Sequence, residues 1–132
     1  MSLEELLSRS DYVSLHLPLV AETRQLIGAK QLAAMKSTAY LINTARGGLV
    51  DHSAVAAALA SGQIAGAALD VQATEPPDLS QPPYNDPRVI VTPHAAFVSH
   101  ESLANLRSRV AQQVATRLTG GCPENVVNGV QC

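Results

Sequence analysis

The chain contains four short apolar segments separated by stretches of mixed polarity. The apolar segments are residues 12–17, 39–45, 65–71 and 88–93. Their apolar residues run on without the strict alternation of a half-exposed strand, which is typical of parallel strands covered on both faces. We therefore predict four buried strands in one parallel sheet.

Helical patterns lie between and after these strands. Residues 29–35 and 52–60 are predicted helices, and the second has Asp51 as its N-cap and Gly62 at its end. A longer helix is predicted from about residue 100 to residue 118. Strands that alternate with helices predict an α/β fold, here a partial doubly wound (Rossmann-like) sheet of about four strands with flanking helices and a long C-terminal helix.

The long C-terminal helix has one apolar face. This face repeats at helical spacing and is predicted to face the core, with arginines elsewhere on the helix surface. Its members are Leu103, Leu106, Val110, Val114 and Leu118.

Side chains with useful chemistry follow the predicted strands. In doubly wound folds the carboxyl ends of the strands border the ligand crevice. Arg46 follows the second strand, Asp70 lies at the end of the third, and His94 follows the fourth. Glu75 precedes His94 by 19 positions, in a loop over residues 73–87 that holds five of the eight prolines.

Three of these residues would form a proton-transfer and carboxylate-binding site. A guanidinium such as that of Arg46 can hold a carboxylate through two parallel hydrogen bonds. The imidazole of His94 can give and recover a proton near neutral pH, and the carboxylate of Glu75 on its far nitrogen would fix the tautomer. Taken singly, each residue also has a structural explanation, such as a surface ion pair or an exposed loop position.

Three motifs extend this interpretation. LINTARGGLVD, GQIAGAALDVQATEPP and VTPHAA occur in this order. Together they resemble the D-2-hydroxyacid dehydrogenases, a family of phosphoglycerate dehydrogenases, hydroxypyruvate and glyoxylate reductases and related corepressors. The resemblance runs from residue 3 to about residue 128, and implies that Arg46, Glu75 and His94 are catalytic, with NAD or NADP as cofactor and a small 2-oxo or 2-hydroxy acid as substrate.

The resemblance also implies a set of cofactor contacts. Leu17 and Pro18 would flank the adenine, Thr44 and Ala45 the nicotinamide ribose, and Asp70 the carboxamide; packing or turn roles are the alternatives. The complete implied set is Leu17, Pro18, Thr44, Ala45, Arg46, Asp70, His94 and Ala96.

No GxGxxG motif occurs in the chain, although a dinucleotide-binding sheet places one after its first strand. We therefore expect residues 1–132 to be one domain, the C-terminal part of a nicotinamide-dinucleotide-binding domain, with the glycine-motif half and most of the substrate domain absent. The isolated chain would then be inactive and would not hold the cofactor tightly. A second hypothesis is a nicotinamide-sensing, non-enzymatic protein similar to the corepressors.

Composition and charge limit the classes of partner that the chain could bind. The net charge of −2 and the scattered basic residues argue against nucleic-acid binding, and no apolar run approaches the length of a membrane span. We predict a cytoplasmic protein, and a homodimer because the first strand would leave an open sheet edge. Cys122 and Cys132 lack metal-ligand spacing, so we predict free thiols and no metal site.

The remaining histidines carry no comparable signal. His16 is predicted to be structural, and His52 and His100 to be solvated at helix starts.

Overall fold

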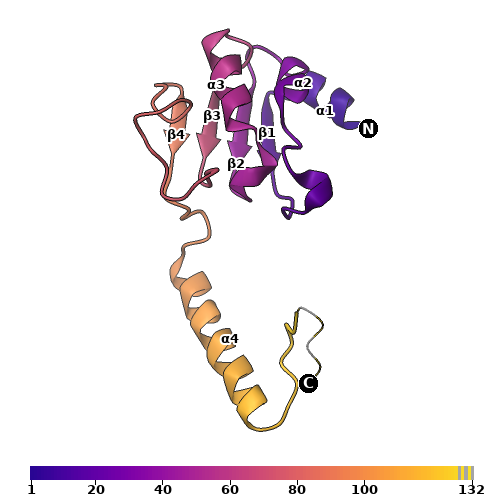
Figure 1. The fold of residues 1–132 in the computed structure, drawn as a ribbon, viewed down its shortest axis with the longest axis vertical. Coiled ribbons are helices and arrows are strands. Elements are labelled where there is room, and N and C mark those ends of the chain that lie inside the picture. The colour runs from indigo at the N-terminus through magenta and orange to yellow at the C-terminus, as the bar shows by residue number, and fades with distance from the viewer. Residues whose placement is uncertain (128, 130, 132) are drawn as a thin grey trace. The chain divides into compact units, whose positions relative to one another are not determined.

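The computed structural model describes residues 1–127, 129 and 131 (Figure 1). It divides into two compact units, Met1–Ala96 and Phe97–Cys132.

The first unit contains the predicted parallel sheet. Its strands are β1 (Tyr12–Leu15), β2 (Tyr40–Asn43), β3 (Gly66–Leu69) and β4 (Val89–Val91), hydrogen-bonded in the order β1-β2-β3-β4. Every neighbouring pair is parallel, which confirms the predicted four-stranded sheet. Each strand ends two residues earlier than predicted, where the chain turns into a loop, and β2, β3 and β4 each begin one residue later than predicted.

Three short helices flank this sheet: α1 (Leu3–Arg9), α2 (Ala29–Ala33) and α3 (His52–Ala60). The Asp51 carboxylate caps α3 by accepting hydrogen bonds from the backbone of Ser53 and Ala54, as predicted. Single 3-10 turns lie at Ala21–Thr23 and Gly47–Leu49.

Helix α1 was not predicted from the sequence. Its signals are a Ser2 side chain that accepts a hydrogen bond from the Glu5 amide, and the Glu5–Arg9 ion pair one helical turn apart. A serine cap with acids in the first turn is an ordinary sign of a helix start.

The core lies between these helices and one face of the sheet. Fully buried leucines from the three helices, Leu7, Leu32 and Leu59, belong to one cluster with Val13, Leu41 and Leu69 of the strands. The intervening strand residues point to the other face, where Tyr12 stacks on Tyr40 with ring centroids 5.7 Å apart and Ile90 is 66% exposed. Within residues 1–96 the prediction of strands covered on both faces is therefore wrong.

The second unit contains helix α4 (His100–Leu118). Its bounds match the prediction, and a reciprocal pair of hydrogen bonds between Ser99 and Ser102 caps its start. No residue of α4 is buried, and Leu106, Val110 and Val114 are each 54% exposed. The apolar face of α4 was predicted to face a core, but it is exposed in this unit. The described residues of the unit form no other helix or strand that could cover it.

Two further sequence expectations are corrected. Cys122 is disulfide-bonded, so the prediction of a free thiol is wrong for this residue; Cys132 lies outside the described residues. His52, the first residue of α3, is 9% exposed rather than solvated, because its ring packs against the ring of Tyr84.

Within the described residues, no helix is long and apolar enough to cross a membrane.

The burial pattern predicts opposite responses for the two faces of the sheet. Leu41→Ala removes a fully buried side chain and should lower the free energy of unfolding by about 2–5 kcal/mol. Ile90→Thr, on the uncovered face, keeps a β-branched residue and should change it by about 0.5 kcal/mol or less. Urea unfolding of the 132-residue chain measures both. Equal losses in the two variants would contradict the assignment of the faces.

Candidate active site

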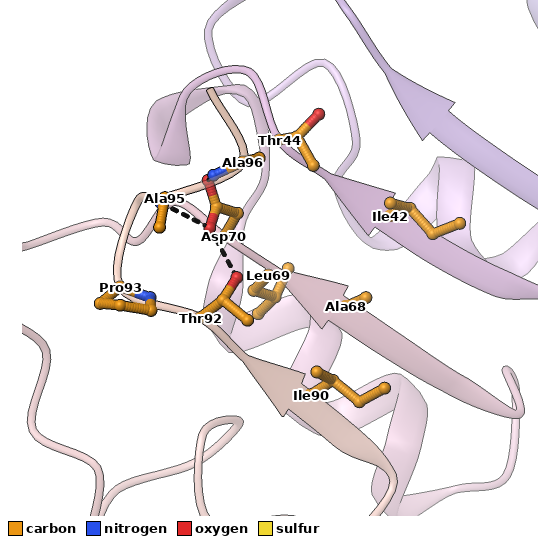
Figure 2. Close-up of a pocket in the computed structure, with 10 residues that line it drawn as sticks. All are labelled: Ile42, Thr44, Ala68, Leu69, Asp70, Ile90, Thr92, Pro93, Ala95 and Ala96. Carbon is orange, nitrogen blue, oxygen red and sulfur yellow. Dashed lines mark hydrogen bonds between the residues drawn. The ribbon is translucent and has the colours of Figure 1, made fainter. Parts of the chain in front are cut away.

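Asp70 lies at the carboxyl end of β3 and is nearly buried. Its Oδ1 accepts hydrogen bonds from the Thr92 hydroxyl at 2.6 Å and the Ala95 amide at 2.9 Å, and its Oδ2 accepts one from the Ala96 amide at 2.9 Å. Figure 2 shows this carboxylate between the ends of β3 and β4, with the turn after β4 folded over it. Asp70 therefore fixes the turn that carries His94.

The pKa of Asp70 is lowered by this environment. Burial opposes ionisation, but the hydrogen bonds from Thr92 and from the Ala96 and Ala95 amides, together with the nearby His94, outweigh burial. The ionised carboxylate is therefore the form that the turn stabilises.

His94 has a left-handed backbone, with φ at 52°, which few non-glycine residues adopt. Its amide donates to the Asp70 carbonyl at 2.8 Å, so the backbone as well as the side chain of Asp70 holds the turn. This conformation brings the imidazole Nδ1 to 2.9 Å from Glu75 Oε2.

Glu75 is held from two sides. Its Oε2 pairs with His94, and its Oε1 accepts a hydrogen bond from the Gln72 amide at 3.1 Å. These two hydrogen bonds, with the charges of His94 and Arg46, lower the pKa of Glu75 against the opposing effect of burial. An ionised carboxylate only accepts hydrogen bonds, so the hydrogen in the His94–Glu75 contact belongs to Nδ1 of His94.

Arg46 follows β2 and is exposed. Its Nη1 donates to the Ala45 carbonyl at 2.7 Å, while its charge contributes to the lowered pKa of Glu75. The buried Asn43 shapes this loop by accepting from the Ala45 amide and donating to the Arg46 carbonyl. Asn43 thus positions the backbone from which the guanidinium extends.

A hollow of about 390 Å³ lies beside Asp70 on the uncovered face of the sheet (Figure 2). Thr44, Asp70 and Ala96, three of the predicted cofactor residues, line it above an apolar floor of Ile42, Ala68 and Ile90. The hollow is therefore an apolar platform with one carboxylate at its rim.

Leu17 lines a different hollow. This second hollow, of about 270 Å³, borders β1 and also includes His16. Pro18, the other predicted adenine neighbour, is exposed and accepts a hydrogen bond from the Thr23 hydroxyl through its carbonyl. The structure therefore places the predicted cofactor residues in two neighbourhoods of the first unit.

Gln72 is a site residue that sequence reasoning missed. Its buried side-chain amide donates to the Leu69 and Thr92 carbonyls, which links the ends of β3 and β4. Its backbone amide donates to the Glu75 carboxylate. A polar residue directly after the Leu69-Asp70-Val71 strand end was the available signal. Among the described residues, no group of three or more His, Cys, Asp or Glu side chains could hold a metal ion.

The parallel sheet, the strand-end carboxylate and the His–Glu pair define a nucleotide-binding α/β domain with acid–base side chains at its carboxyl edge. Residues 1–96 match the family model described as "D-isomer specific 2-hydroxyacid dehydrogenase, NAD binding domain". The chain belongs to this family.

Two curated relatives and a solved structure agree with this assignment. The chain is 46% identical over 126 residues to a glyoxylate reductase of Korarchaeum cryptofilum, covering 96% of this chain and 38% of the relative. It is 45% identical over 136 residues to a glycerate dehydrogenase of Methylorubrum extorquens, covering 96% and 41%. The NAD complex of a D-isomer specific 2-hydroxyacid dehydrogenase from Lactobacillus delbrueckii superimposes with a TM-score of 0.82 at 38% identity, covering 96% of this chain and 43% of that one. The chain thus spans about two fifths of the length of each of these proteins.

The hydrogen bonds to Asp70 predict a pH-dependent stability. A carboxyl group with a lowered pKa stabilises the fold above its unfolded value and loses that contribution as the pH falls through the folded pKa. The ordinary value for Asp70 is 3.8, so the loss should occur below about pH 4. Asp70→Asn should flatten the dependence of the free energy of unfolding on pH in this range, and Thr92→Val, which removes one donor, should have an intermediate effect. Chemical unfolding at a series of pH values between about 2 and 6 measures the free energy of unfolding of each variant. If this free energy depends on pH in the same way in wild type and Asp70→Asn, the role of this carboxylate is contradicted.

Proposed function

We propose that this chain is the C-terminal part of the NAD-binding domain of an oxidoreductase that interconverts a small 2-oxo acid and its 2-hydroxy acid, of the glyoxylate, glycerate or phosphoglycerate type. The observation that carries the proposal is the 2.9 Å hydrogen bond between His94 Nδ1 and Glu75 Oε2, next to a strand-end arginine. The named relatives act on glyoxylate and glycerate, which supports this substrate class.

Each residue of the proposed catalytic set has one task. The Arg46 guanidinium binds the substrate carboxylate and polarises its carbonyl group. His94 donates a proton from Nε2 to the carbonyl oxygen, while Glu75 on Nδ1 orients the ring and stabilises the imidazolium. The chemistry that NADH or NADPH would supply, when bound, is a hydride for C2 of the acid.

The cofactor would be held along the carboxyl edge of the sheet. Thr44, Asp70 and Ala96 line one hollow and would surround the nicotinamide end. Ala45, Arg46 and His94, which lie close to lining residues in the sequence, would complete the set of cofactor contacts. Leu17 and Pro18 would lie toward the adenine. Each carboxylate oxygen has two acceptor positions, so Asp70 can hold the turn and still face a carboxamide.

A nicotinamide-sensing protein is the second candidate function, because such a protein can keep the same three side chains. The relatives named above are called a reductase and dehydrogenases, which gives this candidate no support.

A cytoplasmic location and a homodimer stay predictions from the sequence. Strand β1 lies at an edge of the sheet, which is compatible with pairing between two copies.

Substitution of His94 tests the proposed acid–base role. In the full-length protein that contains this chain, His94→Gln should lower kcat for NADH-dependent reduction of glyoxylate or hydroxypyruvate about 10²- to 10⁴-fold. His100→Gln, at the exposed start of α4, is the matched control and should retain wild-type kcat. A His94→Gln enzyme with more than a tenth of wild-type activity would contradict the role. Wild-type protein that binds NADH but reduces no 2-oxo acid in a panel would instead favour the sensing function.

The lack of a GxGxxG motif predicts weak cofactor binding by these 132 residues alone. Glycine amides and a helix N-terminus normally hold the pyrophosphate, and this chain has no equivalent motif. Titration of NADH against the 132-residue chain, followed by calorimetry, should give a dissociation constant weaker than about 1 mM, near −4 kcal/mol of binding. Micromolar binding or measurable turnover would contradict the assignment to a partial domain.

A further inference from the structure

The buried His52 forms a hydrogen-bonded pair with the partly buried Tyr84. His52, the first residue of α3, has Nε2 at 3.2 Å from the Gly47 carbonyl and Nδ1 at 2.9 Å from the Tyr84 hydroxyl. The two rings also pack on each other, with centroids 5.6 Å apart. Tyr84 comes from the proline-rich loop that also carries Glu75, so the pair joins two loops that are distant in sequence.

The donors and acceptors in this pair can be assigned. A carbonyl oxygen only accepts, so Nε2 of His52 must donate to Gly47. A neutral imidazole then has Nδ1 as its acceptor, and the Tyr84 hydroxyl donates to it. Burial lowers the pKa of His52 against the opposing effects of the Gly47 hydrogen bond and the Asp51 charge, which agrees with a neutral ring.

Gly47 transmits this arrangement to Glu75. A Cβ added to Gly47 would lie 1.9 Å from the Gln72 carbonyl oxygen and 2.9 Å from the Ala73 nitrogen, so the backbone after Arg46 packs directly on the backbone after β3. Gln72 in turn donates its amide to Glu75. A continuous series of contacts therefore runs from Tyr84 through His52, Gly47 and Gln72 to the partner of His94.

Tyr84 is also close to the same segment. Burial raises its pKa, with an opposing hydrogen bond from the Ala73 backbone and a further raising effect from the charge of Glu75. The Tyr84 hydroxyl thus lies within electrostatic range of Glu75 while it donates to His52.

We propose that His52 and Tyr84 are positioning residues that set the separation between Arg46 and the Glu75–His94 pair, an inference that rests on the proposed function. Neither residue needs to touch the substrate. His52 holds the carbonyl one residue after Arg46, and Tyr84 holds the loop that supplies Glu75. Loss of their hydrogen bond lets the two loops move independently and misaligns the carboxylate-binding group with the proton donor.

The first test uses the 132-residue chain and needs no activity. Tyr84→Phe keeps the ring and removes the hydroxyl that donates to His52. Hydrogen exchange at the backbone amide of Gln72 should become about three- to tenfold faster, the equivalent of one net hydrogen bond. His52→Leu should have a larger effect, and His52→Gln, which keeps a donor for the Gly47 carbonyl, a smaller one. Tyr40→Phe, a tyrosine 42% exposed on the uncovered sheet face, is the matched control and should leave Gln72 exchange unchanged.

The second test uses the full-length enzyme. Tyr84→Phe should lower kcat/KM for the 2-oxo acid about tenfold, mainly through a higher KM, with the dissociation constant for NADH unchanged. A purely stabilising role would lower Tm and leave kcat/KM unchanged well below Tm. Unchanged Gln72 exchange, or unchanged kcat/KM in an active enzyme, would overturn the inference. Wild-type protein without reductase activity would refute the proposed function instead, and Gln72 exchange would then decide whether the hydrogen-bond linkage exists.

Discussion

The site depends on the hydrogen bonds that the Asp70 carboxylate accepts from the turn after β4. The Thr92 hydroxyl and the two alanine amides on this carboxylate, together with the His94 amide on the Asp70 carbonyl, hold the turn in which His94 has a left-handed backbone. Because the His94 ring leaves the chain from that backbone, its 2.9 Å contact with Glu75 follows from the turn. A buried structural carboxylate thus determines the geometry of a more exposed acid–base pair.

The parallel sheet explains why these groups meet. Leu15, Asn43, Leu69 and Val91 end their strands at aligned register positions, so the residues that follow them emerge along one edge. The Asn43 side chain then shapes one loop by donating to the Arg46 carbonyl. The Gln72 backbone amide shapes the other by donating to the Glu75 carboxylate. The same edge carries the hollow lined by Thr44, Asp70 and Ala96, so the proposed hydride and proton donors would approach the substrate from adjacent positions.

The four strands, helices α2, α3 and α4 and the candidate residues could be predicted from the sequence, because apolar segments, caps and ordered motifs are local signals. The uncovered sheet face could not, since continuous apolar strands such as residues 65–71 do not reveal whether a covering helix lies within the same unit. His52 was assigned to solvent because a helix-start position is normally exposed; its burial depends on Tyr84, which lies 32 residues away. A turn role was one of the alternatives for Asp70, but its hydrogen-bond partners could not be identified from the sequence, since Thr92, Ala95 and Ala96 follow a different strand.

We propose that Glu75 fixes the protonation pattern of His94 and thereby makes Nε2 the nitrogen that exchanges a proton with the substrate. Two-bond proton–nitrogen NMR of the 132-residue chain, with His94 assigned by substitution, reports which ring nitrogen carries hydrogen in the neutral imidazole. We expect the Nδ1–H tautomer in the wild-type chain. A neutral His94 with its hydrogen on Nε2 would contradict this role of Glu75.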